Sequence, residues 1–285
     1  MSHRSSATYD SPPLPPIADH NGNRGTPETP SQLDNMERQM MHWAKIGSYV
    51  RECYQKSKIC DVRFYVENEV LYAHRAPLCT VSPYFASMFY ENNFLQSKPI
   101  AEVRLRGIAM QSLKIFMEFV YAGKLEITTP TLLDLVRISG QFEVPEIRQR
   151  CIDEINFLHE EDLIQLLVAV REDPSLDFTE PLLRCVADKY LSVCASESFL
   201  ELDVDTLCLI LSNDRLLTHS EMDVFCAGMK WVNYCPEQRS QLLEMVMKCV
   251  RFPLMTQTNL FECLEMSSIL RTNEICLNMI HKANW

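Results

Sequence analysis

Glycine and long apolar runs are both scarce in this sequence. Only 7 of its 285 residues are glycine, and loops that hold phosphates need glycine because their backbone comes close to the ligand. No phosphate-loop, dinucleotide-binding or nucleophile-elbow motif occurs. No run of about 18 apolar residues could cross a bilayer, and residues 1–6 lack the apolar core of a signal peptide. We therefore expect no cofactor and no membrane partner.

Metal-ligand and catalytic patterns are also missing. None of the seven histidines lies four residues from another histidine, or at zinc-ligand spacing from a cysteine. The twelve cysteines contain no pair with the spacing of a zinc ribbon or a redox motif. The acidic run at 160–162 is better explained as a helix start, where carboxylates are favoured, than as an acid–base pair. We expect no metal site, no catalytic residue and no enzymatic activity.

Charge and cysteine usage limit the partners and the compartment. The chain has 38 acidic and 27 basic residues and a net charge of −11, and such a field repels phosphate backbones. Nucleic acid is therefore not an expected partner. With 47% apolar residues the chain needs no disulfide framework, so we expect reduced thiols. The prediction is a cytoplasmic protein, with the nucleus as an open second location.

The N-terminal segment differs in composition from the rest. Residues 1 to about 32 hold six of the fifteen prolines and two of the seven glycines. A segment with so few apolar residues cannot offset the entropy lost on ordering. We therefore predict a disordered tail over residues 1–35.

An apolar seam follows the tail. It consists of Met36, Met40, Trp43, Gly47, Val50 and Tyr54. Their spacings of four and three residues predict one face of a helix. Ile46, Tyr49 and Cys53 form a second, adjacent stripe. So wide an apolar arc favours burial on two sides, either between two copies of the chain or by ordinary packing on its own domain; the pattern leaves both open.

The hydrophobic period then changes twice. Alternation over Ile59–Val66, Glu69–Ala73 and 102–105 predicts strands, and 124–127 predicts a short extended piece. Helical patterns lie between these runs, with a break at Ser82-Pro83 and a C-terminal cap at Gly123. After about residue 160 only apolar helical stretches with short polar breaks remain, and Ser220 with Asp223 gives an approximate capping box. The expected fold is a small mixed α/β region followed by an all-helical one.

Two sets of short motifs resemble known families. The first consists of Ile59-Cys60-Asp61-Val62, Ala73-His74-Arg75-Ala76-Pro77-Leu78, Ser82-Pro83-Tyr84-Phe85, Met88-Phe89 and Phe119-Val120-Tyr121-Ala122-Gly123. It closely resembles the BTB (POZ) domain in content, order and separation. The second consists of Phe199-Leu200-Glu201-Leu202, Leu209-Ile210-Leu211-Ser212-Asn213-Asp214, Ser220-Glu221, Trp231-Val232 and Val250-Arg251-Phe252-Pro253-Leu254. It resembles the BACK domain.

The resemblance implies an α+β fold with a BTB/POZ domain, a small sheet packed by helices, at 36–158. An all-α BACK domain at 159–285 would follow it. The first BTB helix is similar to an element exchanged across a two-fold axis, which implies a homodimer. Its expected interface residues here are Met40, Trp43, Val50 and Tyr54.

The family also has a buried charged pair near the dimer centre. Asp61 and Arg75 occupy the matching positions. Removing one of two buried, paired charges costs about 3 to 5 kcal/mol, so such residues act together as a structural pair. Two unrelated surface charges are the alternative.

Proteins that combine BTB and BACK domains commonly bind cullin-3 and present substrates to a RING ubiquitin ligase. The resemblance assigns the cullin contact to Tyr84, Met88, Phe94, Gln96 and Tyr121. The family has a glutamate where Gln96 stands, and a neutral amide loses roughly 1 kcal/mol of charge-assisted hydrogen bonding. Cullin binding is therefore expected to be weaker than in the family.

The chain departs from kelch-like adaptors at its end. Only 31 residues follow Leu254, fewer than the roughly 50 of one kelch blade. The expected protein is a kelch-like type adaptor without kelch repeats, naturally short or a shortened form, with an unknown substrate protein. An oligomerisation scaffold, or a transcription-linked BTB protein without ligase function, remains the alternative.

Overall fold

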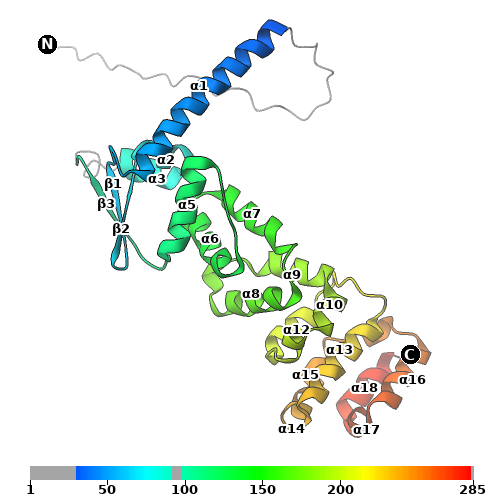
Figure 1. Ribbon diagram of the computed structural model, residues 1–285. Helices are drawn as coiled ribbons and strands as arrows, with labels where there is room; N and C mark the ends of the chain where they lie inside the picture. Colours follow the sequence, from blue (N-terminus) through cyan, green and yellow to red (C-terminus); the bar gives the residue numbers. More distant parts are fainter. Residues whose placement is uncertain (1–29, 92–97, 284–285) are drawn as a thin grey trace, which may run out of the picture. The chain divides into compact units, whose positions relative to one another are not determined.

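The computed structural model describes residues 30–91 and 98–283 (Figure 1). Contacts divide the chain into two units, residues 1–48 and 49–285. Helix α1 runs from Pro30 to Gln55, through the border between them. It begins six residues before the predicted start at Met36, so the tail prediction is wrong for residues 30–35. Proline fits the first turn of a helix because it lacks a backbone N–H, and an N–H at that position would have no partner within the helix. The rest of the predicted tail, 1–29, lies outside the described residues.

A three-stranded sheet follows α1. It consists of β1 (Val62–Val66), β2 (Glu69–Ala73) and β3 (Ala101–Leu105), in the order β2-β1-β3. The β1–β2 hairpin is antiparallel, whereas β1 and β3 are parallel, and Phe64 lies opposite Leu71 and Val103. The predicted strand at 59–66 is shorter than expected, because Ile59 has a φ of 59°, which no strand residue adopts.

Five helices belong to the same region as the sheet. They are α2 (Arg75–Val81), α3 (Pro83–Tyr90), α5 (Met110–Ala122), α6 (Thr129–Gln141) and α7 (Pro145–Ile155). Gly123 ends α5 in the left-handed conformation, as the sequence predicts. The predicted extended piece at 124–127 is wrong: it is a loop that joins α5 to α6 and pairs with none of the three strands.

An aromatic cluster forms the centre of this region. The Phe142 ring lies 4.8 Å from the Phe85 ring and 5.1 Å from the Phe116 ring, and all three side chains are fully buried. The buried Ser82 Oγ donates to the Phe142 carbonyl at 2.6 Å and accepts from the Phe85 N–H at 3.2 Å. Ser82 thus ends α2, begins α3 and fixes both to the segment before α7.

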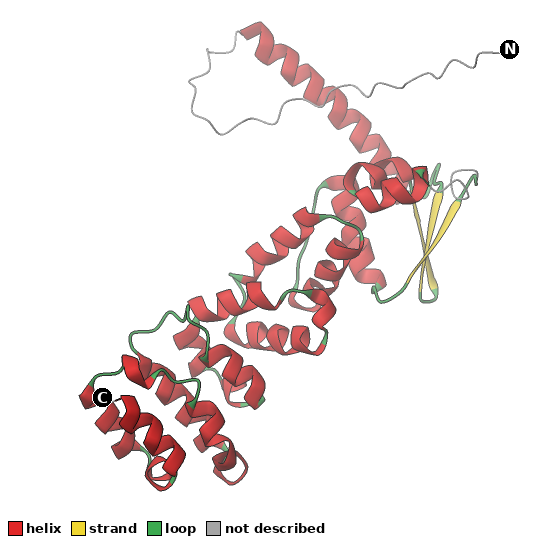
Figure 2. Ribbon diagram, turned by 180° about the vertical axis from the view of Figure 1, so that it is seen from behind, coloured by secondary structure: helices red, strands yellow, loops and turns green. Residues whose placement is uncertain are grey.

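The remaining elements are helical (Figure 2). They are α8 (Glu160–Glu172), η1 (Pro174–Leu176), α9 (Thr179–Asp188), α10 (Tyr190–Ala195), α11 (Glu197–Leu200), α12 (Val204–Leu211), α13 (Glu221–Tyr234), α14 (Pro236–Arg239), η2 (Ser240–Leu242), α15 (Leu243–Met247), η3 (Phe252–Leu254), α16 (Gln257–Met266), α17 (Ser268–Thr272) and α18 (Glu274–Ala283). Ser220 and Asp223 form the predicted capping box of α13. The α+β prediction is confirmed. Within the described ranges, none of these helices has the length and apolar character needed to span a membrane.

The two regions pack on each other through consecutive helices. Helix α8 contacts α6, and α9 contacts α7. Arg137 of α6 pairs with Asp134 at 2.7 Å and with Asp173 at 2.9 Å. Because Asp173 lies between α8 and η1, Arg137 links α6 of the sheet region to the start of the helical region.

Two helical glycines give a test of this packing. A Cβ at Gly228 of α13 would lie 2.8 Å from Val246 Cγ1 of α15, whereas a Cβ at Gly140 of α6 would meet nothing within 4 Å. Because Val246 is fully buried and β-branched, we expect Gly228→Ala to lower the free energy of unfolding by about 1–3 kcal/mol. Gly140→Ala should raise it by about 0.5–1 kcal/mol. Urea denaturation of both variants measures the difference, and equal effects would contradict the close α13–α15 contact.

Candidate interaction surfaces

The N-terminal part of α1 exposes large apolar side chains. Met40 and Trp43, both predicted for a dimer interface, are 69% and 68% exposed in the single chain. The other exposed apolar side chains in this part of the helix are Met36, Met41, Ile46 and Tyr49. Monomeric soluble proteins rarely display a large continuous apolar patch, and one that they do display marks an interaction site. The spacing of Met36, Met40, Trp43, Ile46 and Tyr49 places them on one side of the helix, and we call these five residues the α1 face; Met41 lies on the other side.

The last two turns of α1 pack on their own domain. Cys53 is buried, and the Tyr54 ring stacks on Tyr121 of α5 with centroids 4.3 Å apart. Desolvation raises the pKa of Tyr54 to about 12, so its hydroxyl stays protonated at neutral pH. Val50 is half-buried. Of the four predicted dimer residues, the structure therefore covers Tyr54 within the chain and leaves Met40 and Trp43 uncovered.

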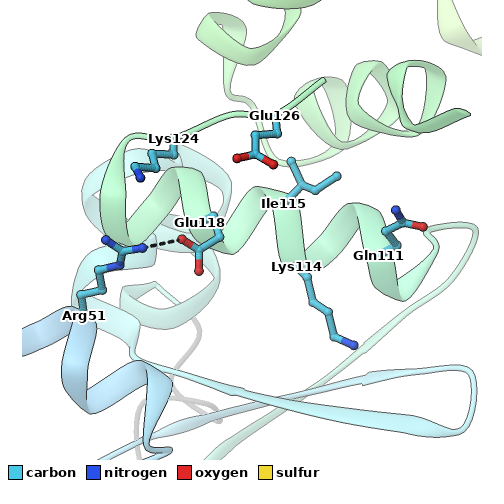
Figure 3. Close-up of a pocket in the computed structure, with 7 residues that line it drawn as sticks. All are labelled: Arg51, Gln111, Lys114, Ile115, Glu118, Lys124 and Glu126. Atoms are coloured by element: carbon cyan, nitrogen blue, oxygen red, sulfur yellow. Dashed lines mark hydrogen bonds and ion pairs between the residues drawn. The ribbon is translucent and has the colours of Figure 1, made fainter. Parts of the chain in front are cut away.

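A pocket lined mostly by charged side chains lies beside this end of α1 (Figure 3). It has a volume of about 350 Å³ and is lined by Arg51, Gln111, Lys114, Ile115, Glu118, Lys124 and Glu126. Arg51 and Glu118 point toward each other and pair at 3.0 Å. The pocket therefore presents both signs of charge, and its Arg51–Glu118 pair joins α1 to α5.

Asp61 and Arg75 lie close together at the start of α2. Asp61 Oδ1 accepts from the Arg75 backbone N–H at 2.8 Å, while its Oδ2 is 3.8 Å from Arg75 Nε. The guanidinium also donates to the Lys98 carbonyl at 2.8 Å and lies over the Phe89 ring. Because the backbone contact is the shorter one, Asp61 supports the first turn of α2 as much as it neutralises Arg75. In the single chain the Arg75 side chain is 16% exposed and that of Asp61 is 41% exposed.

Tyr121 belongs to a small network next to this pair. Its hydroxyl accepts from the His74 backbone N–H and lies 2.8 Å from His74 Nδ1. His74 Nε2 lies 2.8 Å from the Lys58 carbonyl, which can only accept, so Nε2 carries a proton. In the neutral ring, Nδ1 then accepts from Tyr121. Desolvation raises the pKa of the Tyr121 hydroxyl. The structure thus brings Tyr121, predicted for cullin contact, together with Tyr54 of the predicted dimer set.

Tyr84 and Met88 lie on the outer side of α3. Phe85 and Phe89 of the same helix are buried, so Tyr84 and Met88 are half-buried and face outward. They line a shallow hollow of about 770 Å³ together with Pro83, Ala86, Ser87, Tyr90, Glu91 and Glu143. We call these residues the α3 hollow. Phe94 and Gln96, predicted for the same contact, lie outside the described residues.

Three of the motifs in the helical region meet at Arg251. Its Nε lies 3.2 Å from Glu221 Oε2, its backbone N–H donates to Glu221 Oε1 at 2.8 Å, and its Nη1 lies 2.8 Å from Asp214. Glu221 is buried and Asp214 is almost fully exposed. The sequence analysis treated these motifs only as marks of resemblance. Their separation in the chain, 30 and 37 residues, gave no sign of contact.

These features define a class of protein. A small sheet with packed helices and a stack of short helices present an apolar helix face and a shallow hollow, as protein–protein interaction modules do. The BTB/POZ domain family matches residues 50–157. The family described as BTB And C-terminal Kelch (BACK) matches residues 176–265. The chain therefore belongs to the proteins that carry a BTB domain followed by a BACK domain.

Kelch-like proteins are among the known proteins with related sequences. Kelch-like protein 3 of Homo sapiens is 26% identical over 243 residues, which cover 85% of this chain and 41% of the relative. Kelch-like protein 2 of Rattus norvegicus is 24% identical over 279 residues, which cover 96% and 47%. The chain thus spans less than half the length of these relatives. Among solved structures, the BTB domain of zebrafish PATZ1 is similar with 20% identity and a TM-score of 0.37, over 41% of this chain and 93% of that one.

The contacts of Arg251 lead to a prediction on stability. We expect Glu221→Gln to lower the free energy of unfolding by about 2–3 kcal/mol, because Arg251 loses a buried charged acceptor. Asp214→Asn, at an exposed position, should cost less than about 1 kcal/mol. Urea denaturation followed by circular dichroism compares the two variants. An Asp214→Asn effect as large as that of Glu221→Gln would show that burial does not set the strength of these pairs.

Proposed function

We propose that this chain is a non-catalytic, substrate-recruiting adaptor of a cullin-3 RING ubiquitin ligase that acts as a BTB homodimer. The observation that carries the proposal is the presence of a BTB and a BACK domain on one chain. Similarity to Kelch-like proteins 2 and 3 supports it. The substrate would be another protein, and the place of action the cytoplasm, with the nucleus as a second location.

We further propose that the BTB domain extends over 36–158 and the BACK domain over 159–285. The matched ranges 50–157 and 176–265 fall inside these borders. The first border includes the α1 face, which a domain beginning at residue 50 would leave out. The last border includes α17 and α18, whose Leu270, Cys276 and Ile280 are buried.

Dimer formation through the α1 face is supported by the exposure of its large apolar side chains. Burying one large apolar side chain contributes about 1.5–3 kcal/mol, and the α1 face holds five such side chains. A two-fold axis would place the same face of a second copy against it. Arg51, Tyr54 and the Asp61–Arg75 pair hold the base of α1 and the start of α2 in position, which is the structural role we assign to that pair.

Cullin binding would use the α3 hollow together with Phe94 and Gln96. The hollow offers half-buried apolar side chains, Tyr84 and Met88, in a row on one helix. Such side chains anchor an inserted apolar residue well because most of their surface is already packed. Tyr121, with its hydroxyl held by His74, would contribute by supporting this end of the domain.

An oligomerisation scaffold without ligase function is the second candidate. The observation that favours it is Gln96, a neutral side chain where the family has a glutamate. A transcription-linked BTB protein is a variant of the same idea and would act through another, DNA-bound protein. Either role keeps the dimer and loses the cullin contact. The cullin-binding experiment below therefore separates both roles from the adaptor role.

The dimer has a charge-matched test. We expect Trp43→Glu combined with Val50→Glu to give a monomer or an aggregate, because like charges would meet across a two-fold axis. Lys282→Glu, at an exposed position of α18, changes the net charge by the same −2 outside the α1 face and should leave the dimer intact. Light scattering coupled to size exclusion gives the mass of each. A normal dimer in the double variant would refute the placement of α1 in the interface.

Cullin binding can be tested in both directions. In calorimetry with the N-terminal region of cullin-3, we expect Phe94→Ala to reduce affinity at least tenfold, equal to 1.4 kcal/mol. Gln96→Glu should increase affinity roughly fivefold, because it restores a charge-assisted hydrogen bond of about 1 kcal/mol. Phe157→Ala, at a phenylalanine that is 81% exposed after α7, is the matched control. If neither the parent chain nor Gln96→Glu binds at tens of micromolar, the adaptor role is refuted and the scaffold role is supported.

A further inference from the structure

Sulfur atoms from three separate segments converge beside α13. Cys263 Sγ of α16 lies 3.6 Å from Met222 Sδ of α13 and 3.9 Å from Met255 Sδ, which follows η3. Cys226 lies one turn after Met222 on the same helix and influences Cys263 electrostatically. Cys263 is fully buried, while Met222, Met255 and Cys226 are half-buried. The cluster is therefore closed on the inner side and partly open on the outer side.

The separations suit one shared metal ion. Metal–sulfur bonds of about 2.3 Å place three sulfurs of a trigonal site about 4.0 Å apart. The two distances at Cys263, 3.6 and 3.9 Å, are close to that value. A small rotation of the two methionine side chains would bring the three sulfurs into a trigonal arrangement, because methionine has three rotatable side-chain bonds.

The chemistry of the donors selects the ion. Thiolate and thioether ligands favour soft ions such as Cu(I), whereas zinc sites use cysteine, histidine and carboxylates. One thiolate with two neutral thioethers carries a single negative charge, which a monovalent ion neutralises. A divalent ion would leave a net charge in a largely apolar site, which is costly. We propose that Cys263, Met222 and Met255 bind one Cu(I) ion, with Cys226 next to them.

Binding would replace the Cys263 Sγ proton by the metal ion and release that proton to solvent. The ion would connect α13 with α16 and with the segment after η3. Without the ion, these elements are joined at the sulfurs by the contacts of the Cys263 thiol with the two thioethers. Because only the folded chain brings the three sulfurs together, binding would also stabilise the fold against unfolding.

The experiment uses the full chain under anaerobic conditions. Cu(I) affinity is measured by competition with a chromogenic chelator such as bicinchoninate. Ag(I), a redox-inert ion of the same charge, is added to protein labelled with ¹³C at the methionine methyl groups, and the methyl signals are followed by NMR. We expect the Met222 and Met255 signals, assigned through Met222→Leu and Met255→Leu, to shift together at one equivalent.

The variants separate this site from general thiol binding. Met222→Leu and Met255→Leu keep volume and hydrophobicity. Each should weaken the tightest Cu(I) binding more than about tenfold, because the loss of a ligand should exceed the smallest effect of changing a residue outside the ligand set. Cys263→Ser should abolish it. Met266→Leu, an exposed thioether on the same α16 helix, and Cys249→Ser should leave it unchanged.

Unchanged affinity in Met222→Leu and Met255→Leu, or unmoved methyl signals at one equivalent of Ag(I), would overturn the proposal and assign metal binding to other thiols. Equal affinity for Zn(II) with the same methyl shifts would overturn the choice of ion.

Discussion

Phe142 packs against Phe85 and Phe116, and its carbonyl holds the Ser82 hydroxyl. This contact joins α3, α5 and the segment between α6 and α7. It also decides which side of α3 faces outward, because the helix must direct Phe85 and Phe89 to the core. Tyr84 and Met88, on the other side of the helix, therefore line the α3 hollow. The position of the exposed α3 hollow is thus a consequence of the buried aromatic cluster.

The other end of the sheet region depends on a set of polar contacts. Asp61 supports the first turn of α2, and Tyr121 is held between His74 and Tyr54. Each is a partly buried polar group that makes at least one hydrogen bond of 2.8 Å within the domain, which gives it a defined position. Through Arg51 and Glu118 the same region fixes the base of α1. The part of α1 from Tyr49 to Gln55 is thereby fixed to the sheet region.

Parts of this arrangement were predictable because they depend on local rules. The strand at 69–73, the break between α2 and α3 at Ser82-Pro83, the glycine cap at 123 and the capping box of α13 all follow from residues within a few positions of each other. The errors are also local. Proline at position 30 was taken for a tail signal although it also fits a first helical turn, and the alternating residues at 124–127 found no strand to pair with.

The contacts that were not predictable join residues far apart in the chain. The sequence by itself determined the succession of a small α/β region and a helical one, the apolar seam of α1 and the two motif sets, because periodicity and capping act over one or two turns. Only the tertiary structure decided that Arg251 meets Glu221 and Asp214, that Tyr121 joins Tyr54, and that Cys263 lies between two methionines. Such encounters depend on how helices pack, and helix packing reflects the combined shape of many buried side chains.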